Sequence, residues 1–175
     1  MRTEMGDVEP IEAKIRDTQF EVLSGNVRQG VVLSLFATAI LGVALHQIGE
    51  ADGFWVWVMA QVALTVAYFA FVAPRQRALA AVGRARDALR LQLAFDTCYG
   101  LLWGCAAWFF FSPDPAHLMV LVIMVLANVM AVTMASAIYV PCMLVLAGTL
   151  TLPFIGISIL TGGTTLWVAA VAVAL

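Results

Sequence analysis

Residues 54–73 read FWVWVMAQVALTVAYFAFVA, an unbroken stretch without a single charged side chain. An α-helix rises about 1.5 Å per residue, so this stretch is about 30 Å long, the thickness of the hydrocarbon core of a bilayer. The whole chain is similar in character: of its 175 residues, 63% are hydrophobic and only 11% are charged. Soluble domains carry about 25% charged residues. The composition excludes a disordered chain, a secreted disulfide scaffold and a DNA-binding domain, and it predicts a membrane protein.

Scanning the chain for further stretches of this kind predicts an all-α, polytopic bundle of transmembrane helices. We expect five full spans and a truncated sixth, at about residues 29–45, 54–73, 91–111, 116–136, 138–160 and 164–175. The sixth begins near Thr164, and the chain reaches Leu175 while still apolar. We therefore expect the natural polypeptide to continue beyond this point.

Charge predicts the orientation of the spans. All nine basic residues precede the first span or lie between the second and third: Arg2, Lys14, Arg16, Arg28, Arg75, Arg77, Arg84, Arg86 and Arg90. Basic loops face the cytoplasm, so we place the N-terminus there. Four tryptophans then fall near the outer interface, where such rings settle: Trp55, Trp57, Trp108 and Trp167.

The first 28 residues are more polar than the rest, which divides the chain into a cytoplasmic lead-in (1–28) and a transmembrane domain (29–175). Within the lead-in, residues 10–27 have the spacing of an amphipathic helix, with apolar positions such as Ile11, Ile15, Phe20 and Leu23. We expect this helix to lie along the inner leaflet. The alternative is a docking surface for a second protomer or another partner.

Asp96 is the residue most indicative of function, because an ionisable group inside a span is energetically expensive. Tyr99 and Trp103 follow it at i+3 and i+7 on the same helical face. With Asn128 of the fourth span, we predict that these residues form the polar lining of a ligand pocket. The alternative is that Asp96 reaches water or pairs with a basic residue such as Arg90.

The fourth span also carries several methionines, which are typical of adaptable apolar cavities and are compatible with a lipid-like or hydrophobic ligand pocket. They are Met119, Met124, Met130 and Met134. Ordinary helix packing is the favoured interpretation of this pattern.

Two small-residue patterns predict close helix packing, within one protomer or between two. Gly100 and Gly104 form a GxxxG element in the third span, and Ala127, Ala131 and Ala135 form a ridge on the fourth. Such seams are compatible with a homodimer or a larger membrane complex. Pro153 lies inside the fifth span, where it cannot donate a backbone hydrogen bond, and we expect a kink or hinge there.

The sequence contains no recognisable catalytic arrangement: no Gly-rich phosphate loop, nucleophile elbow or Cys-x-x-Cys pair. The three cysteines lie in apolar runs and are interpreted as small buried side chains. His46 and His117 lack the spacing of metal ligands, so we predict no metal and no cofactor. The net charge of −2 gives no reason to expect a nucleic-acid partner, and the lipid bilayer is the partner we expect.

Taken together, these features resemble the N-terminal membrane region of certain bacterial signalling proteins. In those proteins a multi-span sensor module precedes a diguanylate cyclase, phosphodiesterase or hybrid histidine kinase domain. The resemblance rests on the polar lead-in ending in Phe20-Glu21-Val22-Leu23, the Arg-rich second loop, Leu101-Leu102-Trp103-Gly104, and a small-residue fourth span followed by a Pro-containing fifth. It implies a multi-pass protein of the bacterial inner membrane, with any enzymatic activity in a C-terminal domain outside these residues.

Three functions therefore remain open. The leading expectation is a sensory or regulatory module that passes a signal through the sixth span to a cytoplasmic output domain. The alternative is a structural or accessory subunit of a larger respiratory or photosynthetic membrane complex. The third is a small transporter, for which Asp96 and Pro153 are the only support.

Overall fold

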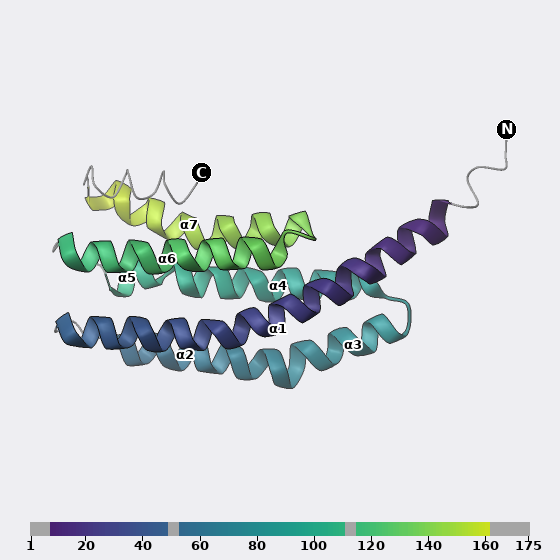
Figure 1. Cartoon of the computed structure of the whole chain (residues 1–175), viewed down its shortest axis with the longest axis horizontal. Helices are drawn as coiled ribbons and strands as arrows, with labels where there is room; N and C mark the ends of the chain where they lie inside the picture. Colours follow the sequence, from purple (N-terminus) through teal and green to yellow (C-terminus); the bar gives the residue numbers. More distant parts are fainter. Residues whose placement is uncertain (1–7, 49–52, 111–114, 162–175) are drawn as a thin grey trace.

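The computed structural model describes residues 8–48, 53–110 and 115–161, and these residues fold entirely into helices and turns (Figure 1). The predicted all-α class is confirmed. In chain order the elements are α1 (Val8–Ile48), α2 (Phe54–Ala67), the π-helical η1 (Tyr68–Val72), α3 (Ala73–Ala81), α4 (Ala85–Gly104), α5 (Ala106–Phe109), α6 (Pro115–Ser136) and α7 (Val140–Thr161).

Three helical stretches in the described residues are long and apolar enough to cross a membrane: Asp17–Ala44, Phe54–Ala81 and Val140–Ile157. They correspond to the predicted first, second and fifth spans. The predicted third span falls on α4, which carries Arg86, Asp87, Arg90 and Asp96 and is not one of the three. The apolar part of α6, Met119–Asn128, is shorter. The predicted sixth span, residues 164–175, lies outside the described residues.

The lead-in and the first predicted span form one continuous helix, α1, of 41 residues. This differs from the expectation of a separate helix on the inner leaflet. The physical reason is a single apolar stripe, Phe20, Leu23, Val27 and Val31, which is buried and passes without a break from one segment into the other. The exposed Ile11 precedes this stripe, and the first turns of α1 stand clear of the other helices in Figure 1.

Polar side chains of α1 fix it to the connection between α6 and α7. Gln19 donates through Nε2 to the carbonyl oxygen of Ile138 (3.3 Å), and Asn26 donates through Nδ2 to that of Ala135 (3.1 Å). These carbonyl groups lie where α6 ends and α7 begins, where helical partners are missing. The part of the lead-in from Gln19 onwards therefore packs against protein.

A π-turn interrupts the second long helix directly before Pro74. The backbone N–H of Ala73 bonds to the carbonyl of Tyr68, five residues back, instead of the usual four. Pro74 has no N–H to donate, and a wider turn relieves the clash that a proline ring causes in a regular helix. The helix continues through α3 and ends at Ala81, and the turn that follows contains Gly83, whose φ of 74° is suited to glycine.

The tightest helix contact in the bundle joins α4 and α7. A Cβ atom on Gly104 would lie 2.8 Å from the carbonyl oxygens of Thr149 and Leu150 and 2.8 Å from Cγ of Pro153. A Cβ atom on Gly100 would collide with the hydroxyl of Thr149. The GxxxG pattern thus brings the two backbones close together, and α1 packs mainly against α6 on the other side of the bundle.

Candidate ligand-binding pocket

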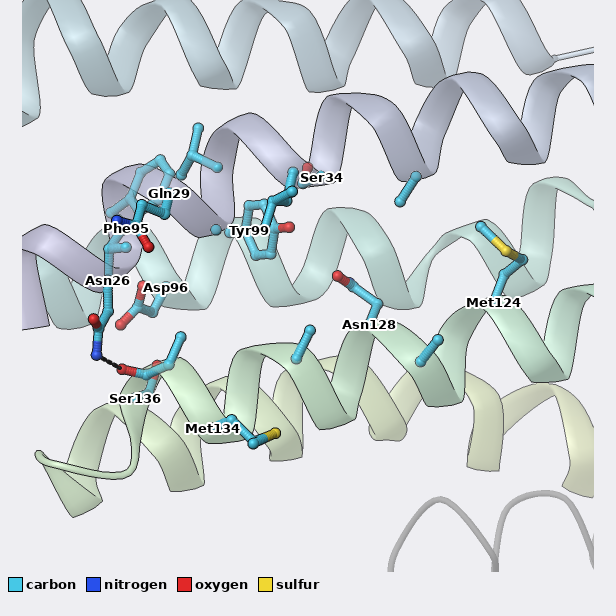
Figure 2. A pocket seen from close by; sticks show the side chains of 18 residues that line it. Asn26, Gln29, Ser34, Phe95, Asp96, Tyr99, Met124, Asn128, Met134 and Ser136 are labelled. Carbon is cyan, nitrogen blue, oxygen red and sulfur yellow. Dashed lines mark hydrogen bonds between the residues drawn. The ribbon is translucent and has the colours of Figure 1, made fainter.

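A hollow of about 430 Å³ lies between α1, α4 and α6 (Figure 2). Its volume is in the range of small-molecule sites. Asp96 and Tyr99 enter it from α4, Asn128 from α6, and Ser34 from α1. Three of the four residues predicted to line a ligand pocket therefore share one cavity.

Asp96 is held at the end of a chain of buried side chains. Its Oδ1 accepts a hydrogen bond from Nε2 of Gln92 (2.7 Å), whose Oε1 accepts one from Nε2 of Gln76 on α3 (2.8 Å). All three side chains are buried. The guanidinium group of Arg90 is exposed and lies 3.6 Å from the carboxyl of Asp87, and the described hydrogen bond of Asp96 is with Gln92.

Three buried polar atoms of the pocket residues have no hydrogen-bond partner within the described part of the chain. They are Oγ of Ser34, Oδ2 of Asp96 and Nδ2 of Asn128, and each side chain is more than nine-tenths buried. The thiol of Cys142, a weak donor, lies beside the Asp96 carboxyl, and the hydroxyl of Tyr99 lies beside the side chains of Ser34 and Asn128. Leaving a buried polar atom unpaired costs about 1–3 kcal/mol, so a group that satisfied these atoms would bind favourably.

The rest of the lining is mostly apolar and adaptable. Met124 and Met134 of α6 border the hollow, together with Phe95 of α4. Met119 and Met130, the other two methionines of the predicted set, also lie on α6 but are exposed and do not line it. The pocket therefore combines an apolar wall with a few polar groups, as small-molecule sites usually do.

Trp103 is the predicted lining residue that the structure places elsewhere. Its ring is fully buried in an aromatic cluster and meets that of Trp57 edge to face, with the centroids 5.0 Å apart. Trp57 in turn donates through Nε1 to the carbonyl oxygen of Leu102 (2.8 Å). Position i+7 shares a face with Asp96 but lies about 10 Å further along the helix, beyond the pocket.

The contribution of α1 to the pocket was not predicted from the sequence. Ser34 lies inside an apolar run, where it looked like an isolated small polar residue, and Asn26 and Gln29 belong to the expected lead-in and its boundary. Gln92 could have been found, because it lies one turn before Asp96, at i−4, where side chains meet. Gln76 could not, because its bond to Gln92 joins two helices.

The alanine ridge of α6 lies at the pocket, whereas the GxxxG glycines lie at the contact between α4 and α7. Ala127, Ala131 and Ala135 line the pocket, where their small side chains leave the space between α1 and α6 open. Pro153 lies inside α7 against Gly104, and its carbonyl oxygen accepts a hydrogen bond from Nε1 of Trp108 (3.1 Å). The proline therefore packs against α4 and accepts a hydrogen bond from α5.

The described residues contain no cluster of three or more His, Cys, Asp or Glu side chains that could hold a metal ion. The side chains of His46 and His117 lie outside the described part of the chain. Cys98, Cys105 and Cys142 are free thiols; Cys142 is buried as expected, whereas Cys105 is half-buried and Cys98 is exposed.

Comparisons with protein-family models, with curated proteins and with solved structures find no match to this chain. Its class therefore follows from the fold and the pocket alone. Its described residues are helical and include three helices of membrane-spanning length, and α1, α4 and α6 border an amphipathic hollow.

Proposed function

We propose that this chain is a ligand-binding sensory module of a bacterial inner membrane. In this proposal α4 and α6 cross the bilayer with the three long apolar helices, residues 164–175 begin a sixth span, and the N-terminus is cytoplasmic. The basic residues support this orientation because they gather at one end of the predicted spans. The resemblance to membrane regions of bacterial signalling proteins supports the sensory role.

One observation carries the proposal: the unpaired polar atoms of Ser34, Asp96 and Asn128 border a hollow whose remaining lining residues are mostly apolar. A packing seam has no need for them, since each would be more stable as an apolar side chain of similar size. A carboxyl group in a span is particularly costly without a partner. A bound molecule would compensate these costs.

The donors and acceptors define the chemistry of the ligand. Oδ2 of Asp96 offers an acceptor when ionised and Nδ2 of Asn128 offers a donor, so the ligand needs both a donor and an acceptor. Its body must be apolar enough to contact Met124 and Met134. We infer a small amphipathic molecule with a hydroxyl or amide group, which reaches the pocket from the membrane.

The pocket walls suggest how binding would be transmitted. Residues 26–37 of α1 form one wall, and the same helix continues towards the N-terminus past the ends of the other helices (Figure 1). A ligand that prefers one spacing of α1 and α6 would shift the population of helix arrangements. A homodimer could pass this shift to a cytoplasmic output, through α1 as well as through the sixth span.

Native mass spectrometry tests the proposal on the chain purified in mild detergent from a bacterial membrane. We expect a small molecule to be retained and to be lost from Asp96→Asn. Asparagine keeps an acceptor for Gln92 but presents an N–H donor where Oδ2 presents an acceptor. Thr97→Val is the matched control, because the Thr97 hydroxyl bonds only to the carbonyl of Leu93 in its own helix (2.8 Å).

Retention in the wild type and in Thr97→Val but not in Asp96→Asn would support the sensor. Equal retention in all three proteins would show that Asp96 does not contact the molecule, and would contradict the proposed site. Purification with fixed, stoichiometric partner chains and without any bound molecule would favour an accessory subunit. Movement of the retained molecule across a sealed vesicle membrane would favour a transporter.

A further inference from the structure

A second cavity, of about 240 Å³, lies between α1 and the helix formed by α2, η1 and α3. We call it the arginine cavity. It is lined by Phe20, Glu21, Ser24, Gly25, Arg28, Tyr68, Ala73, Gln76 and Arg77. It is separate from the candidate ligand pocket, with which it shares no residue.

The arginine cavity combines two cations with a buried donor. Arg28 and Arg77 border it from opposite helices, and the Asp96 carboxyl and both guanidinium groups act electrostatically on the hydroxyl of Tyr68. That hydroxyl is fully buried and has no hydrogen-bond partner within the described residues. Glu21 is the one acidic side chain in the lining and is exposed. Two guanidinium groups and a phenolic O–H suit an anion with several acceptor oxygens.

The π-turn places Tyr68 in this cavity. The extra residue in the turn from Tyr68 to Val72 rotates the preceding part of the helix relative to Gln76 and Arg77. Tyr68 and Gln76 are both buried, and both line the cavity. A local irregularity caused by Pro74 thus positions the unpaired hydroxyl.

An apolar groove adjoins the arginine cavity. It has a volume of about 630 Å³ and is lined by Gly25, Arg28, Gln29, Val32, Leu33 and Phe69. Gly25 and Arg28 belong to both hollows. Val32, Leu33 and Phe69 are exposed, so the groove offers an apolar surface that starts at the cavity and follows α1 towards the middle of the span.

The position along the helices matches the headgroup level of a bilayer. Arg77 lies 23 residues after the start of α2 at Phe54, which corresponds to about 35 Å along a helix. Arg28 lies 20 residues before the end of α1 at Ile48, or about 30 Å. With the far ends of both helices at one interface, the guanidinium groups lie at the other, because the hydrocarbon core is about 30 Å thick.

We propose that the arginine cavity and the adjoining groove form a binding site for an anionic phospholipid. Its phosphate is held by the guanidinium groups of Arg28 and Arg77 and by the hydroxyl of Tyr68, and one acyl chain lies against Val32, Leu33 and Phe69. The charge of the cavity selects the anionic headgroup, and the groove distinguishes a lipid from a free phosphate. The groove shares Gln29 and Leu33 with the candidate ligand pocket, whereas the arginine cavity shares no residue with it, so the proposal does not depend on the identity of that other ligand.

The test is native mass spectrometry of the full chain in detergent with dioleoyl phosphatidylglycerol, dioleoyl phosphatidylcholine or inorganic phosphate. The wild type should retain phosphatidylglycerol in preference to the other two. Arg28→Gln with Arg77→Gln should weaken this binding on the order of tenfold for each guanidinium removed, since each is a charge-assisted hydrogen-bond donor. Arg75→Gln with Arg86→Gln removes the same charge from exposed positions outside both hollows and is the matched control.

A third variant blocks the site without changing its charge. A Cβ atom on Gly25 would have no neighbour within 4 Å, so Gly25→Leu fills open space shared by the cavity and the groove. Leucine also favours the helix more than glycine does, so we expect this variant to fold. It should lose phosphatidylglycerol to a similar extent as the double arginine variant.

Loss in both site variants with retention in the control pair would support the lipid site. Equal loss in the control pair would show a diffuse charge effect and overturn the proposal. Unchanged binding in Gly25→Leu would overturn the assignment to these two hollows. Binding of inorganic phosphate with the same affinity as the lipid would overturn the role of the acyl chain and assign the cavity to a soluble anion.

Discussion

Gln92 donates a hydrogen bond of 2.7 Å to Asp96 one turn further along α4, and both side chains are buried. Gln92 accepts from Gln76 of α3 at the same time, so its amide group is used on both sides. Gln76 lines the arginine cavity and Asp96 lines the candidate ligand pocket. The two cavities are therefore joined by a continuous path of three side chains.

The first prediction concerns the coupling along this path. Gln92→Leu removes both hydrogen bonds and leaves Gln76 and Asp96 each with an unpaired buried atom, at a cost of about 1–3 kcal/mol apiece. Adding Gln76→Leu removes one of these two unpaired groups, the amide of Gln76. We expect the double variant to be more stable than the sum of the single changes, by about 0.5–3 kcal/mol, in a double-mutant cycle.

Unfolding of the four proteins in mild detergent, followed by circular dichroism, gives the required free energies. Gln29 is exposed and has no part in the path, so Gln29→Leu is the control for an exposed amide. Additive effects of Gln76→Leu and Gln92→Leu would show that the observed hydrogen bond between them contributes no coupling.

The second prediction distinguishes two glycines by the space around them. A methyl group on Gly104 would press on the backbone carbonyl groups of Thr149 and Leu150 at 2.8 Å, which cannot move away cheaply. Gly104→Ala should destabilise the protein by about 1–3 kcal/mol. A methyl group on Gly148 would have no neighbour within 4 Å, so Gly148→Ala should stabilise α7 by about 0.5–1 kcal/mol.

Thermal unfolding in detergent measures both variants against the wild type. We expect the unfolding midpoint to fall for Gly104→Ala and to rise for Gly148→Ala. The added methyl group collides with backbone atoms at Gly104 and enters open space at Gly148. Two shifts of the same sign would contradict the close approach of α4 and α7 at Gly104.

The third prediction concerns two neighbouring tryptophans with different roles. Trp57 is buried, donates to the carbonyl oxygen of Leu102 (2.8 Å) and packs edge to face on Trp103, whereas Trp55 is 70% exposed. Trp57→Phe removes the donor and part of the ring contact and should cost about 1–3 kcal/mol. Trp55→Phe should change the unfolding free energy by less than about 0.5 kcal/mol. The same unfolding assay in detergent measures both changes in free energy. Equal losses of stability in Trp57→Phe and Trp55→Phe would place Trp57 outside the core.

The sequence predicts the helical class because uncharged stretches of spanning length leave few other possibilities. It also predicts Asp96, Tyr99 and Asn128 as pocket residues, because polar groups on apolar helices turn towards protein. Trp103 shows the limit of this reasoning. The helical repeat predicts which face of the helix a residue occupies, but it does not predict how far along the helix a pocket extends. Ser34 could not be selected, since its role follows from the packing of α1 on α6 and not from any local pattern.

The last prediction tests the continuity of α1. Leu23 is 1% exposed, and Val22 beside it is 40% exposed, although the sequence assigns both to one amphipathic segment. If residues 10–27 lay on a lipid surface, Leu23→Ala would weaken membrane attachment and leave the stability of the bundle unchanged. Because Leu23 is instead buried in the core, Leu23→Ala should cost about 2–5 kcal/mol, and Val22→Ala should cost far less. Unfolding in detergent separates the two cases, since it removes the bilayer and keeps the contacts between helices.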